Sequence, residues 1–203
     1  MSLIAIQAVF SQKTVRLNLQ NDSYLSIKGS SNVLPFSLHQ QGDKFLTNNK
    51  TFTAFQNQNK LIFNQSQLAI GVENFSSDNS MALRDFKKLM KSDIYPNLQI
   101  QIQQIELLPN ALNSKLLKGT ALVAITITGV TKQYLIPISS NNKGEITIID
   151  GKKNINIRDF GLTPPEELLG LVKVSEWINI NFRLNCKISI QEQEISYYKE
   201  SSK

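Results

Sequence analysis

The sequence is poor in the two side chains that most often carry catalysis and metal binding. It contains a single cysteine, Cys186, and a single histidine, His39. One cysteine cannot form a disulfide within the chain, and these two residues cannot supply the full ligand set of a structural zinc site. A serine or cysteine nucleophile activated by histidine would depend on His39 alone, and no local motif surrounds it. We therefore expect no enzymatic centre, no metal and no cofactor.

Charged residues are also scarce, at 19% of 203 residues, and the formal net charge is +6. The lysines and arginines are dispersed, whereas a nucleic-acid binder gathers them in a stripe with aromatic residues between. The densest basic group, Arg84, Lys87, Lys88 and Lys91, has the spacing of one solvated helix face. We expect no nucleic-acid partner, and a mildly basic surface favours peripheral association with the anionic headgroups of a cell envelope.

Long apolar runs are absent as well. No segment reaches the roughly 18 apolar residues of a transmembrane helix. Residues 3–10 form a short apolar stretch that is followed by Ser11, Gln12 and Lys13. Two interpretations of residues 1–12 stay open: the remnant of a signal peptide, which predicts a periplasmic or secreted protein, or an N-terminal arm. We assign residues 13–195 to one domain and residues 196–203 to a C-terminal tail.

Alternation of apolar and polar residues is what the sequence has in abundance. It is typical of half-buried strands, and it recurs over residues 14–19, 24–28, 35–39, 98–102, 120–128, 133–138, 145–149, 153–158 and 177–190. Turn-forming residues such as Gly42, Gly144 and Gly151 separate these segments. Many short strands with short polar links predict an antiparallel, all-β barrel or sandwich.

Helix signals are few. Asn79 and Ser80 are favourable caps for a helix over residues 81–90, which must end before Pro96. A second helical turn is predicted over residues 164–169. Proline suits the first turn of a helix there, and Glu166 and Glu167 complement the positive end of the helix dipole.

One face of the predicted strands is aliphatic or aromatic, and we expect no charge on it. A barrel of about eight strands either fills its interior with its own side chains or holds one small ligand. An apolar lining suits an aliphatic chain, because each buried CH2 contributes roughly 0.8 kcal/mol. Both alternatives stay open at this point. The candidate residues lining a ligand-binding lumen are Phe36, Ile100, Ile102, Val123, Ile125, Tyr134, Ile136, Ile178, Ile180 and Phe182.

Three stretches of the chain resemble the YceI-like family of lipocalin-like, lipid-binding proteins. They are Arg84-Asp85-Phe86 through Tyr95-Pro96 and the strand after it, residues 119–138 with Gly129-Val130-Thr131-Lys132, and residues 155–184 with Asp159-Phe160-Gly161. The resemblance implies an extended antiparallel eight-stranded β-barrel with one or two short helices. It also implies an apolar tunnel, typically in a periplasmic or secreted protein, that holds a polyisoprenoid, quinone-like or fatty-acyl molecule in relatives. The family often carries a histidine after Gly29, where this chain has Leu34.

Three functional hypotheses follow from this. The first is non-enzymatic binding or transport of a long-chain lipid, and the second is a structural or interaction protein of the cell envelope whose barrel is filled by side chains. An interior cavity well above about 300 Å3 would favour the first. The third, a lipid isomerase or hydrolase, needs an acid and a base inside the barrel. The adjacent pairs Arg84-Asp85 and Arg158-Asp159 are more typical of surface or loop-anchoring ion pairs. All three hypotheses are compatible with either a monomer or a dimer.

Overall fold

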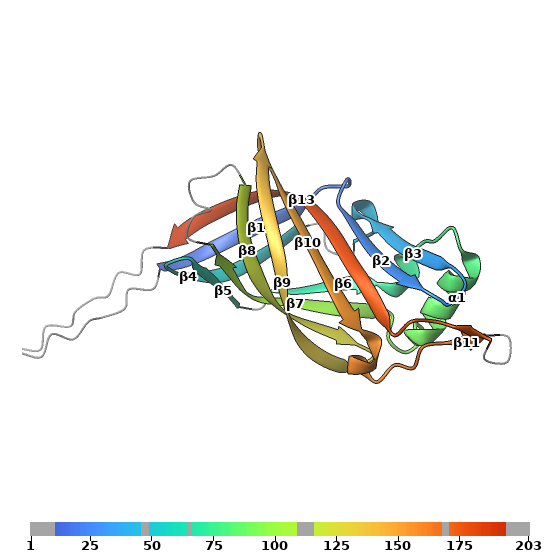
Figure 1. The fold of residues 1–203 in the computed structure, drawn as a ribbon. Helices are drawn as coiled ribbons and strands as arrows, with labels where there is room; N and C mark the ends of the chain where they lie inside the picture. Colours follow the sequence, from blue (N-terminus) through green and yellow to red (C-terminus); the bar gives the residue numbers. More distant parts are fainter. Residues whose placement is uncertain (1–10, 46–48, 65, 109–115, 168–170, 194–203) are drawn as a thin grey trace, which may run out of the picture.

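The computed structural model describes residues 11–45, 49–64, 66–108, 116–167 and 171–193. These residues form strands, one α-helix and short 3₁₀ segments (Figure 1). The strands are β1 (Ser11–Leu19), β2 (Tyr24–Ser30), β3 (Pro35–Gln41), β4 (Asn49–Asn57), β5 (Lys60–Asn64), β6 (Gln67–Gly71), β7 (Asn97–Leu107), β8 (Leu116–Ile127), β9 (Val130–Lys143), β10 (Ile146–Asn156), β11 (Glu166–Glu167), β12 (Val172–Lys173) and β13 (Trp177–Gln193). The helix is α1 (Ser80–Leu89), and the 3₁₀ segments are η1 (Gly42–Lys44), η2 (Val72–Asn74) and η4 (Ile157–Phe160).

Eight strands close into a ring. Neighbouring strands run in the order β1, β4, β5, β7, β8, β9, β10 and β13, and β13 returns to pair with β1. Every pairing around the ring is antiparallel. The ring gives one face of each strand an enclosed interior, so the alternation in the sequence becomes an inside and an outside. The predicted all-β, antiparallel, barrel-like fold is confirmed.

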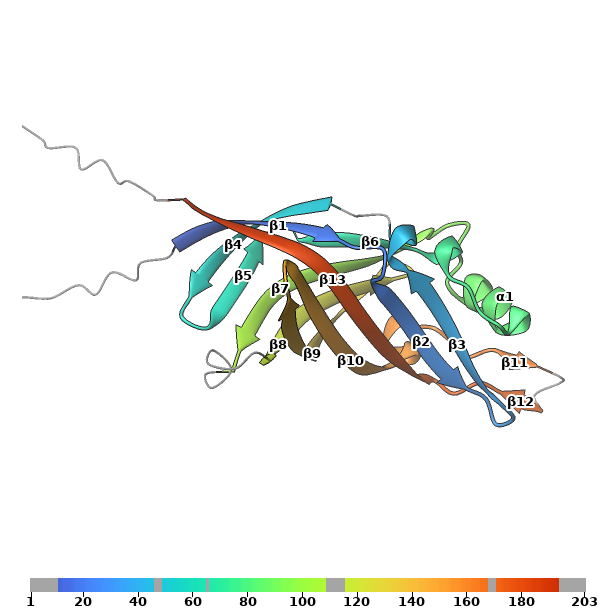
Figure 2. The same cartoon turned by 90° about the horizontal axis from the view of Figure 1, so that it is seen from above.

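Two strands pair with the same edge of the long strand β13. Its C-terminal part pairs with β1, and its N-terminal part pairs with β2. The chain bends between β1 and β2. There the buried Ser23 Oγ donates to the Asn185 carbonyl at 3.1 Å and accepts from the Asn185 amide at 2.9 Å. The β2–β3 hairpin therefore extends the wall of the ring along β13 toward α1 (Figure 2).

The wall is interrupted between β3 and β6. Within the described residues, β6 pairs with β7 alone, and β3 meets only an isolated bridge between His39 and Ser76 on its outer edge. The segment that enters α1 closes this gap, and Ser77 Oγ donates to the Ser37 carbonyl at 2.6 Å. The ring of Phe86 on α1 packs edge-on to Phe75 at 5.0 Å. This end of the barrel is thus covered by a helix and not by strands.

The predicted start of α1 is confirmed. The Asn79 side chain caps the helix, with Oδ1 accepting from the Ala82 amide at 3.0 Å, and the helix stops well before Pro96. No helix in the described part of the chain has the length and apolar character needed to cross a membrane.

The second predicted helical turn, over residues 164–169, is wrong. Glu166–Glu167 instead forms β11 and pairs with β12, while residues 168–170 lie outside the described part. The physical reason is the double proline, because the residue before a proline is pushed from helical to extended geometry. Pro164 is in that position, so the chain stays extended into β11.

The predicted tight link at Gly129 is confirmed. Thr128 and Gly129 have φ angles of +48° and +84°, and together they turn β8 into β9. Two consecutive positive φ angles are the signature of the turn whose twist matches antiparallel strands. Glycine tolerates this geometry because it has no Cβ.

Candidate functional site

The strand register brings all ten predicted lining residues to the interior face. Directly opposed residues of antiparallel strands point to the same side of a sheet. On β7, β8 and β9, Ile102 lies opposite Val123, which lies opposite Tyr134. Gly151 on β10 continues this face from β9 to β13, since it pairs with Ile138 on β9 and with Phe182 on β13. The face is therefore continuous across β7, β8, β9, β10 and β13.

An apolar pocket of about 230 Å3 lies at the end of the barrel covered by α1. Its lining comes from the β2–β3 hairpin, one face of α1, and the segments around β12. The residues are Ile27, Ser31, Val33, Leu34, Phe36, Leu38, Asn79, Met81, Ala82, Asp85, Phe86, Leu89, Met90, Ile157, Pro165, Val172, Val174, Ser175 and Ile178. Of the ten predicted residues, Phe36 and Ile178 belong to this pocket.

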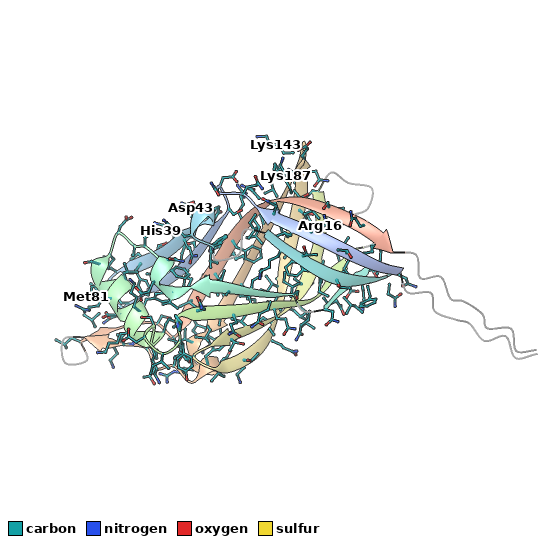
Figure 3. The ribbon with its side chains drawn as sticks, turned by 180° about the vertical axis from the view of Figure 1, so that it is seen from behind. Arg16, His39, Asp43, Met81, Lys143 and Lys187 are labelled. Atoms are coloured by element: carbon teal, nitrogen blue, oxygen red, sulfur yellow. The ribbon has the colours of Figure 1, made fainter. Side chains whose placement is uncertain are left out.

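The rim of the pocket is apolar and exposed. Val33, Leu34 and Met81 are 62%, 63% and 52% exposed, respectively, although all three line the pocket. Figure 3 shows Met81 at the end of the molecule occupied by α1, far from Arg16. The tip of the β2–β3 hairpin is fastened to the β12 region by Asn32, whose Nδ2 donates to the Leu171 carbonyl at 2.9 Å. The exposed Val33, Leu34 and Met81 give the pocket an apolar rim.

The other eight predicted residues lie in the interior beyond the pocket. Val123, Ile125 and Ile136 are buried, whereas Ile100, Ile102, Tyr134, Ile180 and Phe182 are only partly buried. On β13 the partly buried interior positions form a row of Ile178, Ile180, Phe182, Leu184 and Ile188. These side chains face the inside of the ring and pack against the core without being fully buried.

The expectation that no charge lies on the interior face is wrong. Lys153 on β10 is directly opposite Ile180, and its Nζ lies 5.9 Å from the centre of the Tyr134 ring. The pairing of β9 with β10 ends at Ile138 and Gly151, so the two strands separate beyond that point. Lys153 is half-buried, and a long lysine side chain can bury its methylene groups while its charge stays near water.

Tyr134 is held beside this lysine. Its hydroxyl donates to Asp159 Oδ2 at 3.0 Å, and its ring packs on Phe160 at 6.1 Å. Burial, together with the nearby Asp159 carboxylate, raises the pKa of Tyr134 well above its usual range. Tyr134 is therefore a neutral hydrogen-bond donor at any physiological pH. Asp159 pairs with Tyr134, and its neighbour Arg158 forms an ion pair with Glu176, so both residues anchor η4.

The pocket offers little for acid–base chemistry. Asp85 is the one titratable side chain among the described residues that line it. Its Oδ1 is 3.1 Å from Arg84 Nη2, and the Arg84 side chain is exposed. The remaining polar groups have structural roles, since Asn79 caps α1 and Ser31 Oγ accepts from the Leu34 amide at 3.0 Å. Proton transfer needs a donor and an acceptor, and the pocket is better suited to apolar binding.

Sequence reasoning missed most of the pocket lining. Val33, Leu34, Met81, Ala82 and Val174 were not among the candidates, because they lie on a hairpin tip, a helix and a connecting segment. The apolar face of α1 is visible in the sequence, but its position over the barrel end depends on contacts between distant segments. Leu34, at the place where the family often has histidine, is part of the rim.

The sequence pattern of the YceI-like domain matches residues 29–186. The chain belongs to the YceI-like family. Two solved structures share this YceI-like fold across most of their length. A polyisoprenoid binding domain from Saccharophagus degradans, implicated in plant cell wall breakdown, aligns with a TM-score of 0.56 and 10% identity over 89% of this chain and 99% of its own. BcnA from Burkholderia cenocepacia aligns with a TM-score of 0.55 and 14% identity over 85% of this chain and 99% of its own. No curated protein sequence matches the chain.

Proposed function

We propose that this YceI-like protein binds or carries a long-chain lipid, such as a polyisoprenoid, quinone-like or fatty-acyl molecule, without chemical conversion. The observation that carries the proposal is the apolar pocket under α1 together with the partly buried row on β13 that begins at Ile178. The description of the S. degradans relative as a polyisoprenoid binding domain supports it.

Burial of a hydrocarbon chain supplies the binding free energy in this proposal. About ten methylene groups moved from water to an apolar interior contribute roughly 8 kcal/mol before the cost of association is subtracted. The pocket of about 230 Å3 takes one end of a long chain. The remainder follows the row of Ile180 and Phe182 into the ring, which requires these side chains to shift as the chain enters.

The volume of the pocket favours a second candidate function. At about 230 Å3 it is smaller than the roughly 300 Å3 at which ligand sites begin. A barrel that keeps its interior closed would act as a structural or interaction protein of the cell envelope. The two candidates differ in one respect that can be measured, namely uptake of a chain.

We also propose a periplasmic or secreted location, where a carrier would exchange lipid with the envelope. The apolar stretch at residues 3–10 supports this location if it is the end of a signal peptide. Those residues lie outside the described part of the structure. Amino-terminal sequencing of the mature protein tests this proposal, and retention of residues 3–10 would contradict cleavage of a signal peptide at this point.

Filling the pocket tests the carrier proposal. Ala82 is half-buried on the pocket face of α1 and contributes only its backbone amide to the helix cap. Ala82→Phe should lower the affinity for a long-chain prenol at least tenfold, because the ring occupies the volume that the chain needs. Organic extraction and mass spectrometry of the purified protein, followed by prenol titration, measure this.

Lys88→Ala is the matched control, since Lys88 is exposed on the same helix. It should bind like the unmodified protein. Equal binding by all three proteins would mean that the pocket is not the site, and absence of extracted lipid together with absence of prenol uptake would favour the closed-barrel alternative. Circular dichroism checks that each variant is folded.

A further inference from the structure

Gln40 places an unpaired amide oxygen inside the apolar interior. The residue is on the interior face of β3, directly opposite Leu25, and is 1% exposed. Its Nε2 donates to the Lys44 carbonyl at 2.9 Å. No donor in the described part of the chain reaches its Oε1. A buried acceptor without a donor is unfavourable, so a ligand that supplies one would be stabilised there.

The strand register places Gln40 on the interior face, next to the pocket and on the side toward the ring. Ile27 and Leu38 pair across β2 and β3, and both line the pocket. Leu25 and Gln40 form the next interior pair, about 7 Å further along the strands and away from the hairpin tip. Leu25 in turn lies opposite Phe182, in the partly buried row on β13. A chain that advances along this row passes Gln40.

The chemistry of the site distinguishes between the polar ends of lipids. A hydroxyl or amide N–H can donate to Oε1 of Gln40. A carboxylate at neutral pH has no proton to donate, a phosphate monoester is largely a dianion, and the charged oxygens of either would face the partial negative charge of the amide oxygen. The flanking interior residues Leu25 and Leu38 are apolar and buried, and they would not compensate a buried charge.

We infer that Gln40 selects, among long-chain lipids, those with a neutral hydrogen-bond donor at the buried end, such as a prenol. The inference rests on the proposed lipid-binding function and adds the chemical class and the orientation of the ligand. The polar end enters first and donates to Gln40 Oε1, while the chain extends back through the apolar pocket. Lipids with an anionic end bind more weakly because that end cannot be accommodated beside Gln40.

Matched ligands test this selection. Geranylgeraniol and its methyl ether have the same chain and the same oxygen, but the ether has no hydrogen to donate. Isothermal titration should give an affinity about tenfold higher for the alcohol, which corresponds to one satisfied buried acceptor. Equal affinity for alcohol and ether overturns the inference while leaving the lipid-binding proposal intact. Failure of both ligands to bind overturns the proposed function and the inference with it.

A substitution tests whether Gln40 causes the preference for the alcohol over the ether. Gln40→Met keeps the length of the side chain and removes the acceptor, so the affinity ratio of alcohol to ether should fall to about one. Gln101→Met is the matched control, because Gln101 is exposed on the outer face of β7, and it should keep the ratio of the unmodified protein. A Gln40→Met protein that retains the preference overturns the inference. The ligand comparison in the unmodified protein requires no substitution, so it decides even if Gln40→Met does not fold.

Discussion

The burial of Cys186, and with it the pKa of its thiol, depends on the closed ring. The residue is fully buried between β10 and β1, opposite Thr147 and Leu19. Burial raises the pKa of its thiol from 9.0 to about 11. In the unfolded chain the thiol loses its proton near pH 9, whereas in the folded protein it stays protonated up to about pH 11.

The sign of this shift predicts a loss of stability in alkali. The contribution of Cys186 is fully present below pH 9 and is lost as the pH rises toward 11. Within that window the free energy of unfolding should fall by about 1.4 kcal/mol per pH unit from this residue. Urea titrations of the unmodified protein and of Cys186→Ala, which has no thiol, should therefore converge as the pH rises. Parallel curves would contradict the shift.

Gly151 is a second residue whose identity is fixed by its partner. It lies opposite Phe182 on the interior face, and the phenyl ring covers the position that a Cβ would occupy. Gly151→Ala should lower the free energy of unfolding by about 1–3 kcal/mol, because the ring must move. Thermal denaturation measures this loss.

A double substitution isolates the cause. Phe182→Leu removes the ring that collides with the new Cβ of Gly151→Ala. Phe182→Leu should therefore lower the free energy of unfolding less in the Gly151→Ala protein than in the unmodified protein. Strict additivity of the two losses would show that the collision is not the reason for glycine at this position.

Among the elements, α1 differs from the strands in what holds it. The strands of the ring have hydrogen-bonded neighbours on both sides over most of their length. In contrast, α1 is attached through its buried Phe86, through Leu83 and Leu89, which pack against the core, and through an ion pair at 2.6 Å between Lys87 and Glu73. This ion pair is largely exposed and contributes less than about 1 kcal/mol. The helix is the element best placed to move when a ligand enters.

Hydrogen exchange should reveal this difference. In the absence of lipid, amides of α1 should exchange faster than those of β8, because local opening of a weakly attached element costs less than opening of the ring. A bound prenol should slow exchange in α1 and in the β2–β3 hairpin and leave β4 and β5, which do not line the pocket, unchanged. Equal protection of α1 and β8 without ligand would contradict the proposed role of the helix.

The elements also show how far the sequence is informative. Strict alternation predicts β8 and β13, and the cap and apolar spacing predict α1 almost to its ends. β4 was not predicted, because its amide-rich sequence hides the alternation of buried Phe52 and Ala54. The prediction of a helical turn over residues 164–169 was wrong, because the effect of consecutive prolines on the backbone outweighed the helix-start signal.

At the scale of the whole molecule, the candidate site was only partly predictable. The interior face follows from the two-residue period of strands, and all ten candidate residues lie on it. The closure of the ring depends on pairs such as Leu17 with Ile188, which are far apart in the sequence and have no local signal. The pocket forms where the β2–β3 hairpin, α1 and the β12 region meet, so no single segment could reveal it. The contribution of each predicted residue to ligand binding stays a prediction.

If the protein is a lipid carrier, its interior takes up one long apolar chain. Native mass spectrometry of the purified protein with added geranylgeraniol measures this uptake most directly, because it counts bound molecules. We expect a single 1:1 complex that Ala82→Phe weakens and Lys88→Ala does not. A protein that remains free at every prenol concentration, or that binds several molecules with no effect of Ala82→Phe, would contradict the carrier proposal.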